Sequence, residues 1–291
     1  IKAINETTFY PSKGKERLKA MIETRPDWCV SRQRVWGVPL PIFINKKTKE
    51  ILADDEVNEN IASIYEKEGS DCWFSDDPQR FLGNKYKAED YEKLSDIVEV
   101  WFDSGSTHSF VLEKREDLKW PASMYLEGSD QHRGWFHSSL LESCGTRGRA
   151  PFESILSHGF VVDGKGLKMS KSLGNVIAPE DILKKYGADI LRIWVTSSNY
   201  AEDLRIDYSI LDQHSESYRK IRNTFRYLLG NLNDKFEEVK LDEVKINQLP
   251  ELEQLMLHKI YSLNQSFNRY FSEYDFHNLY KELLSFCTVD L

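Results

Sequence analysis

Cysteine is scarce in this sequence, and its few copies are widely spaced. Among 291 residues there are four cysteines, at positions 29, 72, 144 and 287, and no two of them form a CxxC pair. Structural zinc sites and redox dithiols usually depend on such pairs. The seven histidines also lack the HxxxH spacing of a metal-binding helix. We therefore expect no protein-bound metal and a reducing, cytoplasmic environment.

Long apolar runs are absent as well. No segment approaches the ~20 apolar residues that a membrane-spanning helix needs. Residues 1–19 lack the apolar block of a secretory signal. We therefore expect no contact with a membrane. The chain starts with Ile1 instead of methionine, so we expect it to be a piece of a longer protein.

The common nucleotide-binding and hydrolase signatures are missing. Neither the GxxxxGK[ST] loop nor the GxGxxG fingerprint occurs, and the spacing gives no Ser–His–Asp or Cys–His arrangement. The net charge of −8 repels phosphate at long range. A nucleic acid would therefore have to bind through local basic patches.

The first third of the chain predicts mixed structure around a polar insertion. Apolar spacing predicts a helix over 13–24 and a strand near 40–45, and the chain length predicts two or three structural units. Residues 46–98 are polar and charged, with one helix predicted over 57–68. We interpret 46–98 as an inserted module.

From residue 97 the sequence pattern changes to short β-rich runs, each followed by a polar loop. The runs are IVEVWF, MYLEG and ILSHGFVV, and the loops cover 101–108, 127–135 and 164–172. Ser129 and Asp130 are good N-caps for the helix expected after the second run. Loops at the carboxyl ends of adjacent strands converge on one crevice of an α/β sheet, so we expect these three to meet.

Beyond residue 210 the pattern is helical throughout. Apolar residues recur at steps of three and four, and further helices are expected over about 251–271 and 275–288. The acidic stretch 234–250 is expected to link the first helix to the second. Three arginines recur at helical spacing on one face, namely Arg219, Arg222 and Arg226.

Several motifs together resemble one known family. KMSKS at 168–172 is its signature loop, and it follows RPDWCVSRQRVWGVP, VWFDSGSTHSF and YLEGSDQHRGWFHSSLLES in that order. These blocks are similar to class I aminoacyl-tRNA synthetases, and in particular to the isoleucine branch of the bacterial or organellar type. SRQRxWG alone also fits the leucyl and valyl branches, whereas GSDQHRGWF favours isoleucine. The resemblance covers nearly the whole chain.

The resemblance implies roles for individual residues. Lys168 and Lys171 would be catalytic, stabilising the charge that builds up on the leaving pyrophosphate. The residues implied to bind ATP are Lys171, Met169, Ser170, His158 and Gly159. Those implied to bind the aminoacyl-adenylate are Glu127, Gly128, Asp130, Gln131, Trp135 and Trp101. Arg219, Arg222 and Arg226 would contact tRNA, and a solvated helix face is an equal alternative for them. For the two tryptophans the alternative is a place in the apolar core.

The resemblance also implies a fold and its divisions. The fold class is α/β, the second half of a Rossmann-like nucleotide-binding fold, followed by an all-α helical domain. The expected divisions are the end of an editing or connective insertion (1–24), the catalytic half-fold (25–175, containing the 46–98 module), a region following the signature loop (176–210) and a truncated anticodon-binding domain (211–291). The family's other signature, HIGH, and its editing domain are absent from the sequence. We therefore expect these residues alone not to form the adenylate.

The implied function is that of an isoleucine–tRNA ligase, which activates L-isoleucine with ATP and transfers it to tRNA(Ile). Mg²⁺ would accompany ATP as part of the substrate, and the full-length protein would be a monomer in the cytoplasm. A valyl or leucyl relative is one alternative. A synthetase-like RNA-binding module without catalysis is a second, and an α/β scaffold that carries KMSKS by chance is a third.

Overall fold

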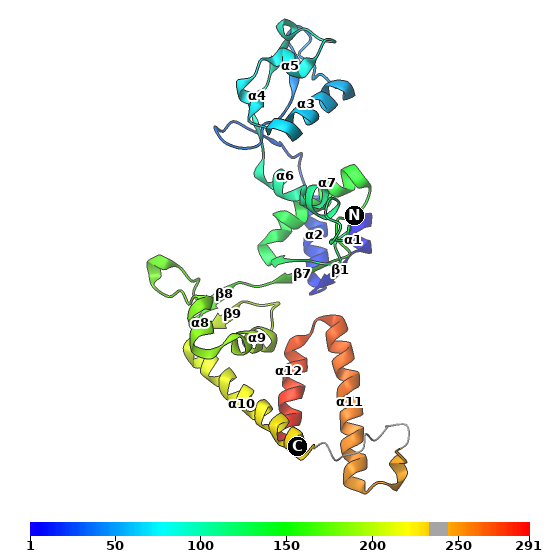
Figure 1. Ribbon diagram of the computed structural model, residues 1–291, viewed down its shortest axis with the longest axis vertical. Coiled ribbons are helices and arrows are strands. Elements are labelled where there is room, and N and C mark those ends of the chain that lie inside the picture. The colour runs from blue at the N-terminus through cyan, green and yellow to red at the C-terminus, as the bar shows by residue number, and fades with distance from the viewer. Residues whose placement is uncertain (233–243) are drawn as a thin grey trace. The chain divides into compact units, whose positions relative to one another are not determined.

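The computed structural model describes residues 1–232 and 244–291. The chain divides into two compact units, one formed by Ile1–Tyr125 and Asp130–Ile155, the other by Leu126–Ser129 and Leu156–Leu291 (Figure 1). Most of the expected linker over 234–250 falls outside the described residues. No helix in the described part of the chain is long and apolar enough to cross a membrane. The functional boundaries expected from the sequence remain predictions.

The first unit is built around a short sheet and the helices that cover it. Its largest sheet has the strand order β1-β7-β6, and the division between the units passes through β6 and β7. A parallel bridge between Ala122 and Phe152 lies directly before these two strands. The elements are α1 (Lys2–Glu6), β1 (Thr8–Tyr10), α2 (Lys13–Glu23), β2 (Ser31–Arg32), β5 (Ile97–Val98), α6 (Val100–Gly105), β6 (Tyr125–Gly128), α7 (Trp135–Arg147) and β7 (Ser154–His158).

One apolar core holds this unit together. Leu18 of α2, Phe136 of α7 and Ile155 of β7 are each 0% exposed and belong to the same cluster of buried side chains. Since α2 and α7 are far apart in the sequence, burial of their apolar faces in one core holds the early and late segments of this unit together. The helix predicted over 13–24 is confirmed by α2.

The insertion has a core of its own. Trp73 is 0% exposed, its ring lies 5.1 Å from that of Phe43 and 4.9 Å from that of Phe81, and its Nε1 donates to the carbonyl of Leu94 at 2.7 Å. The strand predicted near 40–45 and the helix predicted over 57–68 are both present. The elements are β3 (Phe43–Asn45), α3 (Asp55–Glu68), α4 (Cys72–Ser75), α5 (Pro78–Leu82), the 3₁₀ turn η1 (Ala88–Asp90) and β4 (Tyr91–Lys93), which pairs with β3.

The prediction of a loop over 101–108 is wrong, because this segment is helical. Glu99 accepts a hydrogen bond from the backbone N–H of Trp101 at 3.1 Å and so caps α6. The hydroxyls of Ser104, Ser106 and Thr107 donate to carbonyls three residues back, which satisfies these polar side chains within helical turns. After α6 the chain continues into the π-helical turn η2 (His108–Leu112).

The expectation that the three β-rich runs form adjacent strands is only partly correct. The second and third runs are adjacent, because β7 of the third run neighbours β6 in the three-stranded sheet. The first run differs, since β5 pairs with β2, and β8 (Val161–Asp163), which ends the third run, pairs with β9 (Leu204–Ile206) in a sheet of its own. A β-rich run in the sequence identifies a strand but not its partner, which depends on contacts with residues far along the chain.

The start of α7 differs from the prediction as well. Ser129 and Asp130 do not cap it; they lie in the 3₁₀ turn η3 (Ser129–His132), and the N-cap residue is Gly134. The amide oxygen of Gln131 accepts from the backbone N–H of Trp135 at 2.9 Å, which supplies the capping bond from another residue.

The second unit is mainly helical. Its core packs Ile182, Ile190, Trp194 and Leu211 with Leu204 and Ile206 of β9. The helices predicted beyond residue 210 are confirmed by α10, α11 and α12. The remaining elements are the 3₁₀ turn η4 (Lys171–Leu173), α8 (Pro179–Tyr186), α9 (Ala188–Ser197), α10 (Tyr208–Asn231), the 3₁₀ turn η6 (Ile246–Gln248), α11 (Glu251–Glu273), α12 (Phe276–Ser285) and the π-helical turn η7 (Phe286–Asp290).

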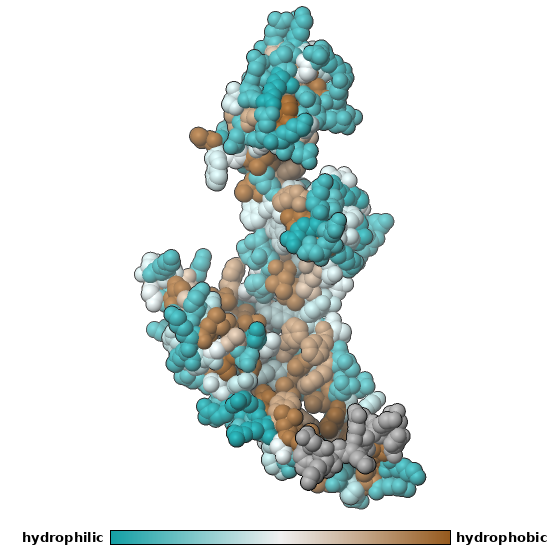
Figure 2. Space-filling view, viewed as in Figure 1, coloured by the Kyte–Doolittle hydropathy of each residue, from teal (hydrophilic) through white to brown (hydrophobic). Residues whose placement is uncertain are grey.

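Parts of these helices leave apolar side chains at the surface. Figure 2 shows brown apolar patches among the helices of this unit, and Phe225 of α10 and Leu255 of α11 are 50% and 49% exposed. Nothing in the described residues covers them.

The buried ring of Trp73 gives a prediction for stability. Trp73→Ala removes a fully buried side chain and its hydrogen bond, so we expect the free energy of unfolding of the insertion to fall by about 3–5 kcal/mol. Phe74→Ala is the matched control, since Phe74 is 45% exposed, and its cost should stay below about 1 kcal/mol. Urea unfolding measured for both variants tests this, and equal losses would contradict the assignment of Trp73 to the core.

Candidate functional site

The KMSKS loop leaves β8 and returns to the same strand. Val162 and Lys168 form an antiparallel bridge, so the loop begins with a tight turn. Gly166 and Gly174 have φ angles of 83° and 64°, a region that favours glycine. Ser170 caps the following turn η4, with its hydroxyl accepting from the backbone N–H of Leu173 at 3.3 Å.

The two lysines of the loop are free. Lys168 and Lys171 are exposed, and within residues 1–232 and 244–291 neither ammonium group has a hydrogen bond or an ion pair. Between them Met169 packs against the core of the second unit. The loop thus has an apolar anchor at its middle residue and an unneutralised positive charge on each side.

His158 and Gly159 are held by the segment before β9. The backbone N–H of Gly159 donates to the carbonyl of Tyr200 at 2.8 Å, and a Cβ at Gly159 would lie 2.2 Å from the carbonyl oxygen of Glu202. Only glycine fits this close approach of two backbones. The Nδ1 of His158 donates to the carbonyl of Gly159 at 2.7 Å, which leaves Nε2 of a neutral ring as an acceptor.

Glu127 is the last side chain before the end of β6. It is exposed, and one of its oxygens accepts from the backbone N–H of Gly128 at 2.9 Å. The other oxygen has no protein partner among the described residues. The carboxylate is therefore oriented locally and keeps the capacity to pair with a cation.

Trp101 and Trp135 come together in the first unit. A Cβ at Gly134 would lie 3.0 Å from the Trp101 ring, so glycine is what allows this ring to reach the start of α7. The Trp135 ring stacks on Tyr125 with 4.0 Å between centroids and 4° between planes, and its Nε1 donates to the carbonyl of Ser104 at 3.0 Å. Trp101 is 42% exposed, so one indole is fixed and the other remains open.

Asp130 and Gln131 stabilise the start of α7 through side-chain hydrogen bonds. The carboxylate of Asp130 accepts from Nε2 of Gln131 at 3.2 Å, and Gln131 in turn caps Trp135. The predicted site residues therefore form two groups. Trp101, Asp130, Gln131 and Trp135 belong to the first unit, whereas Glu127, Gly128, His158, Gly159 and the KMSKS loop belong to the second.

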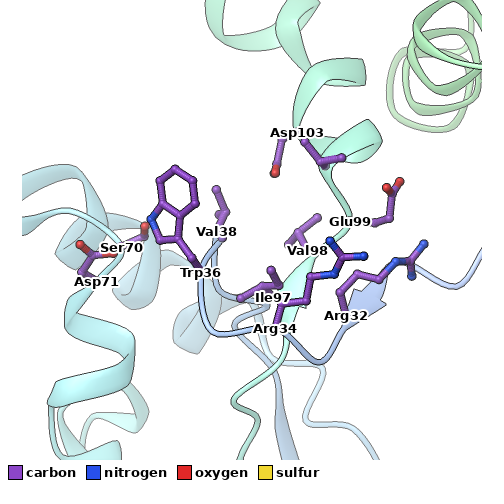
Figure 3. A pocket seen from close by; sticks show the side chains of 12 residues that line it. Arg32, Arg34, Trp36, Val38, Ser70, Asp71, Ile97, Val98, Glu99 and Asp103 are labelled. Carbon is purple, nitrogen blue, oxygen red and sulfur yellow. The ribbon is translucent and has the colours of Figure 1, made fainter. Parts of the chain in front are cut away.

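A cavity of about 450 Å³ in the first unit is not among the features predicted from the sequence. Figure 3 shows Arg32 and Arg34 on the same side of it as Glu99, with Trp36 on the opposite side. Trp36 is 92% exposed, and the guanidinium of Arg32 is held by the carbonyl of Ser31 at 2.8 Å. The residues that could have indicated this cavity are the two arginines and the tryptophan of the SRQRVWG motif.

Two half-buried carboxyl side chains, Asp103 and Glu142, lie between α6 and α7. Burial, followed by the nearby charge of Asp103, raises the pKa of Glu142 to about 8. Burial and then the charge of Glu99 raise the pKa of Asp103. A Cβ at Gly105 would lie 2.1 Å from one oxygen of Glu142, and neither carboxyl oxygen of Glu142 has a hydrogen-bond partner in the described chain. The two helices thus meet at a carboxyl group that is protonated at neutral pH.

A neutral histidine lies on α7 itself. Burial, then the charges of Arg25 and Arg133, lowers the pKa of His137 to about 4. Nη1 of Arg25 lies 3.0 Å from Nε2 of His137, so the guanidinium donates to an uncharged ring. Arg25 also lies over the ring of Trp28, with 5.0 Å to its centroid.

The titration of Glu142 gives a prediction of pH dependence. Because the pKa of Glu142 is raised in the folded state, the folded chain keeps its proton between the usual value of 4.5 and about 8, whereas the unfolded chain loses it. This contribution to stability is complete below the unfolded pKa and is lost as pH rises through the folded pKa. Glu142→Gln should therefore be more stable than wild type at about pH 9 by about 1 kcal/mol, discounted for partial exposure.

Urea unfolding at about pH 5 and about pH 9 tests this. At the lower pH the two proteins should differ little. Glu116→Gln is the control, since Glu116 is exposed, and its effect should be the same at both pH values. A gain for Glu142→Gln that does not change with pH would contradict the interpretation.

The predicted tRNA-contacting arginines lie along α10. All three are exposed. Arg219 pairs with Glu216 at 3.0 Å, with both side chains more than half exposed, so this pair contributes little to stability. Arg222 and Arg226 have no ion pair with any described residue and are available for phosphate groups.

Comparison with known proteins gives a consistent result. The family model of class I tRNA synthetases (I, L, M and V) matches residues 1–207. The chain is 84% identical over its whole length to the isoleucine–tRNA ligase of Pelagibacter ubique and 52% identical to that of Zymomonas mobilis, covering 32% and 31% of those proteins. It thus spans about a third of the length of the curated relatives it matches.

Solved structures match the fold. A leucyl-tRNA synthetase (LeuRS) of Agrobacterium radiobacter, in a ternary complex with tRNA and LeuAMS, has a TM-score of 0.61 at 18% identity and aligns with 95% of this chain and 39% of its own. Methionyl-tRNA synthetase of Mycobacterium tuberculosis, in complex with methionyl-adenylate, has a TM-score of 0.62 at 16% identity, with 96% and 46% covered. The predicted fold class is confirmed. The chain belongs to the class I tRNA synthetases of the I, L, M and V group.

Proposed function

We propose that this chain supplies the KMSKS half of the catalytic centre of an ATP-dependent isoleucine–tRNA ligase. The observation that carries the proposal is the 84% identity, over every residue of this chain, to a protein named isoleucine–tRNA ligase. The reaction joins the carboxylate of L-isoleucine to the α-phosphate of ATP and releases pyrophosphate. The aminoacyl group then passes to tRNA(Ile).

The free lysines suit the first step. As pyrophosphate leaves, negative charge grows on its oxygens, and a cation placed there stabilises the transition state more than the ground state. Lys168 and Lys171 are exposed and unpaired among the described residues, so no internal ion pair has to be broken before they bind phosphate. An ammonium group on a flexible stem can follow the departing group as it moves.

The remaining candidate residues divide between the nucleotide and the amino acid. His158, Gly159, Met169 and Ser170 would hold ATP, whose Mg²⁺ enters as part of the substrate. Glu127, Gly128, Asp130 and Gln131 would hold the adenylate. The free carboxylate oxygen of Glu127 suits the α-amino group of isoleucine, because this pairing is a charge-assisted hydrogen bond.

Trp101 and Trp135 would form walls for the isoleucine side chain. Trp135 is fixed by stacking on Tyr125 and by a hydrogen bond to the carbonyl of Ser104. Its position therefore does not depend on the ligand, as expected for a wall that distinguishes side chains by shape. The partly exposed Trp101 leaves apolar surface for the ligand to cover.

Two features support tRNA as the second substrate. The pocket in Figure 3 is lined by two guanidinium groups and an open indole, a combination that can hold the backbone and bases of a single strand, and also by the acidic residues Asp71, Glu99 and Asp103. Arg222 and Arg226 add exposed positive charge on α10. On a chain with a net charge of −8, such local patches are where phosphate can bind. We propose that the full-length protein acts as a cytoplasmic monomer.

Pyrophosphate exchange tests the amino-acid assignment. In a protein of the relatives' full length that contains this sequence, isoleucine should support exchange into ATP far better than valine or leucine. A preference for valine or leucine would move the protein to that branch of the family. Absence of exchange with all three would favour a non-catalytic RNA-binding module.

The role of Lys171 gives a separate prediction. Lys171→Ala should lower the rate of isoleucyl-adenylate formation by about 10²-fold or more, in line with loss of one charge-stabilising donor, while the affinity for isoleucine changes little. Lys165→Ala is the matched control, an exposed lysine of the same loop outside the signature, and should retain the wild-type rate. Single-turnover kinetics measures both, and an unchanged rate in Lys171→Ala would remove this residue from the proposal.

A further inference from the structure

Asp163, the last residue of β8, organises the first turn of the KMSKS loop. One oxygen of its carboxylate accepts from the backbone N–H groups of Lys165 at 3.0 Å and Leu167 at 2.8 Å. The backbone adds two bonds, from Gly166 to the carbonyl of Asp163 at 2.8 Å and from Asp163 to the carbonyl of Leu167 at 2.9 Å. A single carboxylate oxygen thus accepts from two of the backbone N–H groups of the turn, which fixes where the chain turns back.

Asn175 connects this turn to the rest of the loop. Its Nδ2 donates to the second oxygen of Asp163 at 2.9 Å, and its Oδ1 accepts from the backbone N–H of Ser170 at 2.9 Å. A third and longer bond joins Nδ2 to the carbonyl of Lys168 at 3.3 Å. One amide side chain therefore holds the backbone on both sides of Met169.

These bonds restrain the backbone beside the lysines and leave their side chains alone. The hydrogen bond from Asn175 and then that from the backbone of Leu167 hold the pKa of Asp163 below its usual value, so this group is ionised at neutral pH. A loop whose backbone is already ordered loses less conformational entropy when its charged side chains engage a ligand.

From this network we infer that Asp163 and Asn175 are positioning residues that preset the KMSKS loop for the leaving pyrophosphate. The inference rests on the proposed function, because it assigns these two side chains to the loop that carries Lys168 and Lys171. Neither side chain touches the substrate in this account. They act by fixing the backbone from which the two ammonium groups extend.

The polarity of the bond between the two residues allows a swap experiment. Asn175→Asp places two carboxylates face to face, and Asp163→Asn places two amide groups where a carboxylate and an amide met. In the double variant the amide introduced at position 163 can still accept from the backbone of Lys165 and Leu167. It can also donate to the carboxylate introduced at position 175, which still accepts from Ser170. Only the longer bond to the carbonyl of Lys168 has no replacement. Comparing wild type, the two single variants and the double variant therefore isolates the coupling between positions 163 and 175.

The swap is tested in the full-length protein by ATP-dependent adenylate formation at saturating isoleucine. Each single variant should raise the KM for ATP or lower kcat, with a loss in kcat/KM of at least about tenfold, and the double variant should return to within about threefold of wild type. Isoleucine affinity should stay unchanged throughout. Asn45→Ala is the matched control, since Asn45 also accepts from two backbone N–H groups, of Lys47 at 2.9 Å and Thr48 at 3.0 Å, in a surface turn of the insertion; it should keep wild-type kinetics.

Trypsin cleavage after Lys168 and Lys171 gives a readout that needs no catalysis. Cleavage should be about tenfold faster in each single variant and return toward the wild-type rate in the double variant, because a loosened backbone enters the protease more often. Single variants with wild-type kinetics and cleavage, or a double variant no better than the singles, would overturn the inference. If wild type forms no adenylate with isoleucine while cleavage follows the swap, the proposed function fails and the structural role of the pair stands.

Discussion

Two uncompensated ammonium groups on an ordered loop are the feature on which this account depends. The chain carries a net charge of −8, and some of its described lysines and arginines pair with acidic side chains, as Lys85 does with Asp54 at 2.6 Å. Lys168 and Lys171 have no such partner among the described residues. Since exposed charge that is left unpaired costs little in water, the arrangement keeps both groups ready for an anion at small expense in stability.

The KMSKS loop has a restrained backbone, while its two lysine side chains remain free to bind. Met169 is anchored in the apolar core, and the hydrogen bonds of Asp163 and Asn175 restrain the backbone on both sides of it. Gly164 adds a second anchor, because a Cβ there would lie 2.1 Å from the carboxylate of Asp207, the residue that caps α10. The KMSKS loop therefore packs against the N-terminus of α10, the helix that carries the exposed arginines. The loop and α10 are the two elements of the second unit that we propose to contact substrates.

The first unit also holds its candidate site residues in place through local contacts, here of aromatic and carboxyl groups. Trp135 is locked from two sides, whereas Trp101 reaches the start of α7 only because Gly134 has no side chain. Between α6 and α7 the protonated Glu142 takes a place that an ionised carboxylate would destabilise, next to Asp103 and against the backbone of Gly105. A protonated carboxyl can be buried at lower cost than a charged one, which is why two acidic side chains can lie at this helix contact.

Sequence reasoning succeeded where the signal is local. Helical periodicity located α2 and α10, and the motif order led to the correct family. It failed where the answer depends on distant partners: β5, β6 and β8 look like neighbours in sequence but pair in separate sheets. It also failed for 101–108, whose serines and glycine suggested a loop, because packing of α6 on α7 favours the helix. Asp163 and Asn175 lie outside the signature itself, and twelve residues separate them in sequence, so only the folded loop reveals that they meet.

Chemical modification of the lysines tests the central claim most directly. In the full-length protein, the rates at which an amine-reactive reagent labels Lys168, Lys171 and Lys165 can be followed by mass spectrometry, with and without ATP and isoleucine. The account predicts that the two substrates together protect Lys168 and Lys171 strongly and leave Lys165 reactive. Equal labelling of all three lysines in the presence and absence of the substrates would contradict it.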